Sequence, residues 1–128
     1  MEDLTISNLF VPYKESLELK KLGFNEPCFT YYKNDQLSDI LELVKNSEME
    51  NVNNEIHNYI SAPTFQQAFR WFREKYKLQS YIRHECPDVE PYYDFVIDED
   101  VYDVMKDTYE EAELECLRKL IEIVKNGK

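Results

Sequence analysis

The sequence predicts a single α+β domain in which three main α-helices pack on an antiparallel sheet of three to four strands. Two segments begin with Thr followed three residues later by Gln or Glu and then carry apolar residues at helical spacing. Between the helical segments, aromatic and β-branched runs bounded by Gly, Pro, Asn and Asp are typical of strands. The 128 residues suffice for one domain, residues 1–128, with a hydrophobic core.

A helix is predicted near the start of the chain, after an N-terminal arm of residues 1–11. Pro12 suits the first turn of a helix over residues 13–22. Gly23 can adopt the left-handed conformation that ends a helix, so the boundary is expected there.

The next segments are less regular. Residues 28–33 are aromatic and β-branched, which indicates a strand. Residues 36–46 have helical spacing, but residues 40–44 could equally be the return strand of a hairpin from residues 28–33. The Asn-rich and Glu-rich residues 46–58 are expected to form an exposed loop.

The central helix is predicted over residues 64–77, with Thr64 as its N-cap and Gln67 completing the capping box. Its apolar stripe forms a core face: Phe65, Ala68, Phe69, Phe72 and Tyr76. Trp71 lies at the margin of this stripe. Its ring is therefore either half-buried or an exposed anchor for a partner.

The C-terminal part predicts a hairpin and a helix. Residues 79–85 and 92–98 read as two antiparallel strands, joined by a turn through residues 87–91. Residues 98–106 are interpreted as an acidic turn. Thr108 with Glu111 forms the second capping box, which predicts a helix over residues 109–125.

Charge and composition limit the functional classes. Apolar residues at 43% and aromatics at 14% argue against a disordered chain. The net charge of −11 makes direct nucleic-acid binding an unfavoured function, because such binding relies on Lys and Arg. Acidic residues concentrate in residues 85–115, where Lys106 is the only basic residue. An acidic face of this kind can steer a basic partner or drive self-association, so a homo-oligomer stays open.

The expected location is the cytoplasm, with no role in a membrane. The sequence has no run of about 18 apolar residues and no signal peptide at its start. Its cysteines, Cys28, Cys86 and Cys116, are odd in number and far apart, which favours reduced thiols.

The candidate chemistry is limited to one pair of residues. His84 and Cys86 share a face of a predicted strand, where they could act as base and nucleophile or bind a metal. Cys28 and His57 could complete such a site in space. A structural role is the favoured interpretation of these residues. No catalytic residue, metal site or cofactor is therefore predicted.

Three carboxylates of the predicted acidic turn, Asp98, Asp100 and Asp103, could hold a hard cation or perform acid–base chemistry. They lack a defined ligand loop. The favoured interpretation is a solvated turn.

Two surfaces of the central helix are candidate binding sites. The first places Trp71 beside Gln67 and Lys75, where an exposed ring could anchor a protein partner. The second is a basic set that could sequester an anionic nucleotide: Arg70, Arg73, Lys77 and Arg83.

Four segments resemble a family of small uncharacterised proteins encoded by phages and prophage-like elements of gut bacteria. The segments are Phe10-Val-Pro-Tyr13, Leu22-Gly-Phe-Asn-Glu-Pro-Cys28, Ser61-Ala-Pro-Thr-Phe-Gln-Gln-Ala-Phe-Arg-Trp-Phe-Arg-Glu-Lys-Tyr76 and Tyr109-Glu-Glu-Ala-Glu-Leu-Glu-Cys-Leu-Arg-Lys-Leu-Ile-Glu-Ile-Val124. The resemblance implies expression in an infected host cell. The resemblance implies no particular activity and identifies no functional residue.

These observations favour a non-catalytic accessory protein of phage type that binds a host or phage macromolecule, modulating host defence or metabolism. The alternatives are a protein that sequesters an anionic nucleotide and a small hydrolase or metal protein that uses His84 and Cys86.

Overall fold

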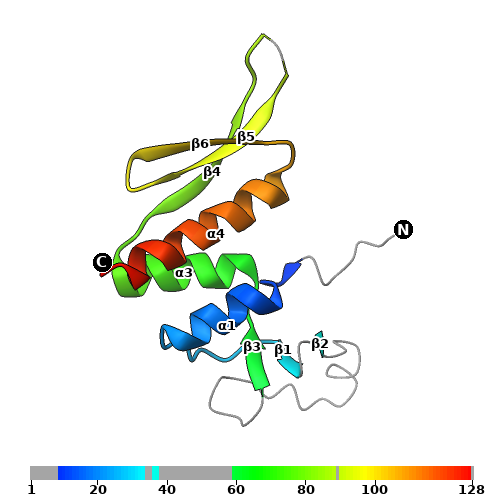
Figure 1. Ribbon diagram of the computed structural model, residues 1–128, viewed down its shortest axis with the longest axis vertical. Helices are drawn as coiled ribbons and strands as arrows, with labels where there is room; N and C mark the ends of the chain where they lie inside the picture. Colours follow the sequence, from blue (N-terminus) through cyan, green and yellow to red (C-terminus); the bar gives the residue numbers. More distant parts are fainter. Residues whose placement is uncertain (1–8, 34–35, 38–58, 89, 128) are drawn as a thin grey trace. The chain divides into compact units, whose positions relative to one another are not determined.

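The computed structural model describes residues 9–33, 36–37, 59–88 and 90–127 (Figure 1). These residues form three helices and two antiparallel sheets of three strands each, which confirms the α+β class. Contacts between residues group the chain into two compact units, an N-terminal unit of residues 1–68 and a C-terminal unit of residues 69–128. The single domain stays a prediction. Most of the expected arm and all but the start of the segment 36–58 lie outside the described residues.

The first helix of the N-terminal unit, α1, spans Tyr13–Lys21 and ends as predicted. Gly23 has a φ of +100°, a left-handed conformation that costs little without a side chain. The N–H groups of Gly23 and Phe24 then donate to the carbonyls of Lys20 and Leu19, each at 3.0 Å. This pair of bonds is the Schellman motif.

The sheet of the N-terminal unit contains β1 (Thr30–Lys33), β2 (Gln36–Leu37) and β3 (Tyr59–Ala62) in the order β2-β1-β3. Tyr32 pairs with Leu37, so the chain returns antiparallel directly after β1. The start of the ambiguous segment is therefore a hairpin strand; residues 38–46 lie outside the described part.

A small core joins these elements. The buried side chains of Phe10, Tyr32 and Ala62 pack together. The Tyr32 hydroxyl donates to the carbonyl of Val11 at 2.9 Å, and the ring meets Tyr13 edge-on at 5.5 Å. Burial, with the nearby Glu15 carboxylate, raises the pKa of Tyr32.

Helix α3 spans Phe65–Tyr76. The backbone N–H of Gln67 donates to Thr64 Oγ1 at 3.1 Å, which confirms the predicted N-cap. Ala68 and Phe72 have no exposed surface, as expected for the core stripe. The helix ends where Lys77 turns left-handed, with a φ of 60°.

The C-terminal unit holds the second sheet, in the order β4-β5-β6. Strand β4 (Ser80–Glu85) pairs antiparallel with β5 (Tyr92–Ile97), which confirms the predicted hairpin. The acidic turn predicted over residues 98–106 is wrong, because Asp100–Lys106 forms a third strand, β6.

The turn itself is confined to Asp98 and Glu99. Both residues are left-handed, with φ of 49° and 79°, as a tight hairpin turn requires. The Asp98 carboxylate accepts from the N–H of Gln79 at 2.9 Å, and the Asp98 N–H donates to the Gln79 carbonyl at 2.8 Å. These bonds tie the turn to the start of β4.

Helix α4 spans Tyr109–Lys125 as predicted, and Thr108 Oγ1 accepts from the N–H of Glu111 at 3.1 Å. In Figure 1 the helix lies along one face of the β4-β5-β6 sheet. Its buried side chains are Ala112, Cys116, Leu117, Leu120 and Ile121. None of the helices in the described ranges is long and apolar enough to cross a membrane.

Candidate functional site on the outer face of the β4-β5-β6 sheet

The two faces of the β4-β5-β6 sheet differ in what covers them. The inner face packs against α4. The ring centroids of Tyr93 and Tyr109 of α4 are 6.1 Å apart, and Lys119 Nζ of α4 lies 5.4 Å from the ring centroid of Tyr102. Because strand side chains alternate, their neighbours in sequence belong to the opposite face. We call this opposite surface the outer face, formed by Tyr81, Arg83, Glu85, Tyr92, Asp94, Val96, Val101 and Asp103.

One row of the outer face is apolar. Tyr81 pairs with Val96, and Val96 pairs with Val101, so the three residues form one line across the three strands. Val96 is only 4% exposed, whereas Tyr81 is 59% exposed and Val101 51%. The row therefore combines a buried centre with two apolar side chains that present most of their surface to solvent.

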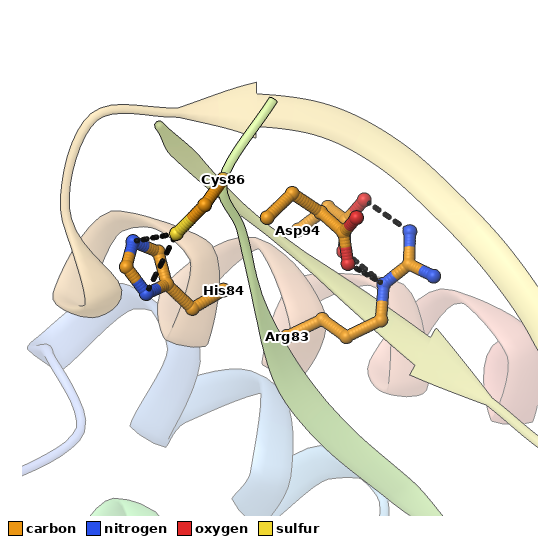
Figure 2. A network of polar contacts seen from close by, with 5 residues as sticks. Arg83, His84, Cys86 and Asp94 are labelled. Carbon is orange, nitrogen blue, oxygen red and sulfur yellow. Dashed lines mark hydrogen bonds and ion pairs between the residues drawn. The ribbon is translucent and has the colours of Figure 1, made fainter. Parts of the chain in front are cut away.

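The next row contains an ion pair whose carboxylate is fully buried (Figure 2). Asp94 has no exposed surface, and Arg83 reaches it from the paired position on β4. Arg83 Nε donates to Asp94 Oδ1 at 2.8 Å, and its Nη2 donates to Oδ2 at 2.7 Å. Glu85 Oε2 lies 3.1 Å from the same Nε. The two carboxylates raise the pKa of Arg83, so the guanidinium stays charged and fixed in place.

Acidic side chains surround this face. Burial and then the carboxylates of Asp103, Glu85 and Asp94 raise the pKa of Tyr92. Exposed acids near the strand ends are Asp88, Glu90, Asp98, Glu99 and Asp100. The basic residues of β4, β5 and β6 are Arg83 and Lys106, and both lie within 4.0 Å of carboxylates. A negative potential therefore surrounds the apolar row.

His84 and Cys86 come together at the end of β4, but without a directed hydrogen bond. The Cys86 sulfur lies 3.8 Å from His84 Nδ1 and 3.7 Å from Nε2. A sulfur on the lone-pair axis of one ring nitrogen would lie much farther from the other. The near-equal distances place the sulfur midway between the two nitrogens and off both lone-pair axes; Figure 2 draws the two contacts. This geometry does not set His84 to take the thiol proton.

The His84 ring is held in place by stacking. It lies parallel to Tyr93, its partner on β5, with centroids 4.5 Å apart. Both His84 and Cys86 are exposed to solvent. Of the other candidates for a shared site, Cys28 is buried in the N-terminal unit and His57 lies outside the described residues.

A metal site is not assembled in the described part of the chain, where no three His, Cys, Asp or Glu side chains gather to hold an ion. Asp98 accepts a backbone hydrogen bond in the turn, and Asp100 and Asp103 lie on β6. All three carboxylates are exposed to solvent as predicted, but Asp100 and Asp103 belong to a strand, so the prediction of one turn through the three residues is wrong.

The predicted partner anchor on α3 lacks the exposed ring that it requires. Trp71 is 6% exposed and meets Phe72 and Tyr76 edge-on at 5.1 and 5.4 Å. Lys75 Nζ lies 5.6 Å from the centroid of the Trp71 ring. Gln67 Nε2 donates to Glu26 Oε1 at 3.2 Å and to the carbonyl of Pro27 at 2.9 Å, so its amide is engaged within the N-terminal unit.

The predicted anion-binding set loses Arg83 as a free cation. Arg70 and Arg73 are exposed on α3, and Lys77 is exposed directly after it. Arg83 cannot serve as a free cation with them, because Asp94 and Glu85 already neutralise it. Phosphate binding relies on uncompensated donors, which Arg83 does not offer.

The exposed apolar row was missed by the sequence analysis. The sequence correctly predicted a strand for Tyr81 but a turn for Val101. The line of apolar residues across the three strands was therefore not predicted. The signal lay in the β-branched and aromatic residues Val101, Tyr102 and Val104, which are typical of a strand. Searches of protein-family models, curated proteins and solved structures found no match to this chain.

Proposed function

We propose that this protein is a non-catalytic accessory protein that binds a protein partner through the outer face of the β4-β5-β6 sheet. The observation that carries the proposal is the pair of exposed apolar side chains, Tyr81 and Val101, on either side of the buried Val96. An apolar centre surrounded by charged groups is the usual composition of a protein interface. The resemblance of four segments to phage and prophage proteins is the reason to seek this partner in a bacterial host cell.

The neighbouring Arg83 supports this assignment. Its guanidinium is fixed by Asp94, yet the side chain remains 33% exposed. A fixed donor loses little conformational entropy when a partner carbonyl approaches it. The same neutralised charge makes a free anion a poor ligand for this face.

The test is capture of a partner by the full chain from a gut-bacterial lysate, read by mass spectrometry. Tyr81→Ser and Val101→Thr remove the exposed apolar groups, and each should weaken capture by about 2 kcal/mol if it removes a central anchor. The matched control is Phe29→Ser, because Phe29 is an aromatic residue of the N-terminal unit that is 62% exposed.

The expected result is a protein that wild type and Phe29→Ser capture and that Tyr81→Ser loses. Melting temperature must stay unchanged in all variants, since the replaced side chains are exposed. Capture that is equal for wild type, Tyr81→Ser and Val101→Thr would contradict the proposal.

A further inference from the structure

The two edges of the β4-β5-β6 sheet are not equivalent. Strand β4 pairs with β5 through six consecutive positions, Ser80 to Glu85, without a register shift. Strand β6 has a register shift opposite Tyr93 and Phe95, and Met105 adopts a left-handed φ of 52°. Irregularities of this kind protect an edge from pairing with another strand. Strand β4 carries none of them.

The outer edge of β4 has unpaired backbone groups within the described part of the chain. In that part β4 has one neighbour, β5. A strand at an edge directs alternate N–H and C=O groups away from its neighbour. These groups offer a new strand a row of donors and acceptors over six residues.

The side chains beside this edge specify what the new strand must carry. Tyr81, Arg83 and Glu85 lie along the outer face of β4 in that order. A strand added next to β4 places its own side chains beside them at a spacing of two residues. An apolar side chain fits beside Tyr81. A basic side chain fits beside Glu85, whose Oε2 also lies 3.1 Å from Arg83 Nε.

We propose that β4 binds its partner by strand addition, and that the partner segment is extended and basic, with an apolar and a basic residue four positions apart on one face. This inference rests on the proposed function and names the chemistry of its partner. The net charge of −11 and the acids around the sheet favour a basic segment over a second copy of this chain.

The test uses the full chain and a synthetic capped peptide of repeating Val-Val-Thr-Thr-Lys-Lys-Thr-Thr, which places Val and Lys four positions apart on both faces of a strand. Amide hydrogen exchange is followed by NMR with and without the peptide. We expect exchange of the outward β4 amides to slow by about tenfold or more at saturation, while β6 amides stay unchanged. The effect should weaken with added salt and in Tyr81→Ser but not in Phe29→Ser.

The matched probe is a capped peptide of repeating Val-Val-Thr-Thr-Glu-Glu-Thr-Thr, which should protect nothing. Equal protection by this acidic peptide, protection at β6 instead of β4, or unchanged exchange at β4 each overturn the inference. In the absence of peptide, slower exchange of the β4 amides at higher protein concentration would assign the edge to a second copy of the chain. That result would also overturn the inference.

Failure of strand addition can be told apart from failure of the proposed function. If Tyr81→Ser loses the lysate partner but the basic peptide leaves β4 exchange unchanged, the outer face binds a partner by another geometry. If lysate capture does not depend on Tyr81, the proposed function itself fails.

Discussion

Arg83 holds both carboxylate oxygens of Asp94, at 2.8 and 2.7 Å, although Asp94 has no exposed surface. A buried carboxylate that loses its partner remains as an uncompensated charge, which destabilises a fold strongly. We therefore expect Arg83→Met to lower the melting temperature more than Asp94→Leu does, because the Arg83 side chain left by the second change is 33% exposed and can be hydrated.

The double variant Arg83→Met with Asp94→Leu removes both charges. It should recover much of the stability that Arg83→Met loses, which thermal unfolding by circular dichroism measures. Arg73→Met on α3, where Arg73 is exposed, controls for loss of a surface arginine. A double variant as unstable as Arg83→Met would show that the ion pair is not the cause.

This ion pair also marks the limit of sequence-based prediction for the chain. Asp94 belongs to residues 85–115, where acidic residues concentrate, so its charge suggests a solvated position. Its burial follows from pairing with Arg83, eleven residues earlier, across two strands. The strands themselves were predicted, but the register that joins these residues is not a local property.

Helix boundaries were predicted well because their signals are local. Thr64 and Thr108 each accept a hydrogen bond from the residue three positions on, as the capping pattern predicts. The first capping box is only half formed, because the Gln67 side chain turns to Glu26 and Pro27 instead of the Thr64 backbone. A tertiary contact therefore replaced the local one.

Strand β6 was missed for a different reason. Asp98 and Glu99 form a left-handed turn without Gly or Asn, the residues that usually indicate such a turn. The bonds between Asp98 and Gln79 stabilise this conformation from outside the turn. The sequence does not reveal the contact between Asp98 and Gln79, so it predicted one long turn for the acidic residues. Without strand β6, the outer face of the sheet could not be predicted.

Trp71→Ala should lower the free energy of unfolding by about 3 kcal/mol, because it leaves a cavity where a buried ring was. Chemical denaturation of the full chain measures the change. Gln66→Ala, at an exposed position of the same helix, should have little effect. A Trp71→Ala variant that is as stable as wild type but loses the lysate partner would restore Trp71 as the anchor.

Thiol labelling should distinguish one cysteine of the three. Burial raises the pKa of Cys28 and of Cys116 to about 12, whereas Cys86 is exposed. The thiolate is the reactive form, so Ellman's reagent should modify one thiol quickly in the native protein and all three after denaturation. Cys86→Ser should abolish the fast reaction. A fast phase that persists in this variant would mean that a buried thiol becomes accessible.

Glu113 should make stability depend on pH near neutrality. It is half-buried on α4, and burial, followed by the nearby Glu110 carboxylate, raises its pKa from 4.5 to about 7. Between these values the folded protein keeps a proton that the unfolded chain has released. Stability from this group is therefore present below pH 4.5 and is lost as pH rises to about 7.

Glu113→Gln removes the charge, so this variant should be more stable than wild type at pH 8. The expected gap in the free energy of unfolding is about 1 kcal/mol after allowance for partial solvent screening. The gap should close as the pH falls towards 4.5, the ordinary pKa of the group, because Glu113 is then protonated in both states. Denaturation curves measured across this range for wild type, Glu113→Gln and the exposed control Glu90→Gln test the assignment. A gap that stays constant with pH would show that the gain comes from packing and not from the proton.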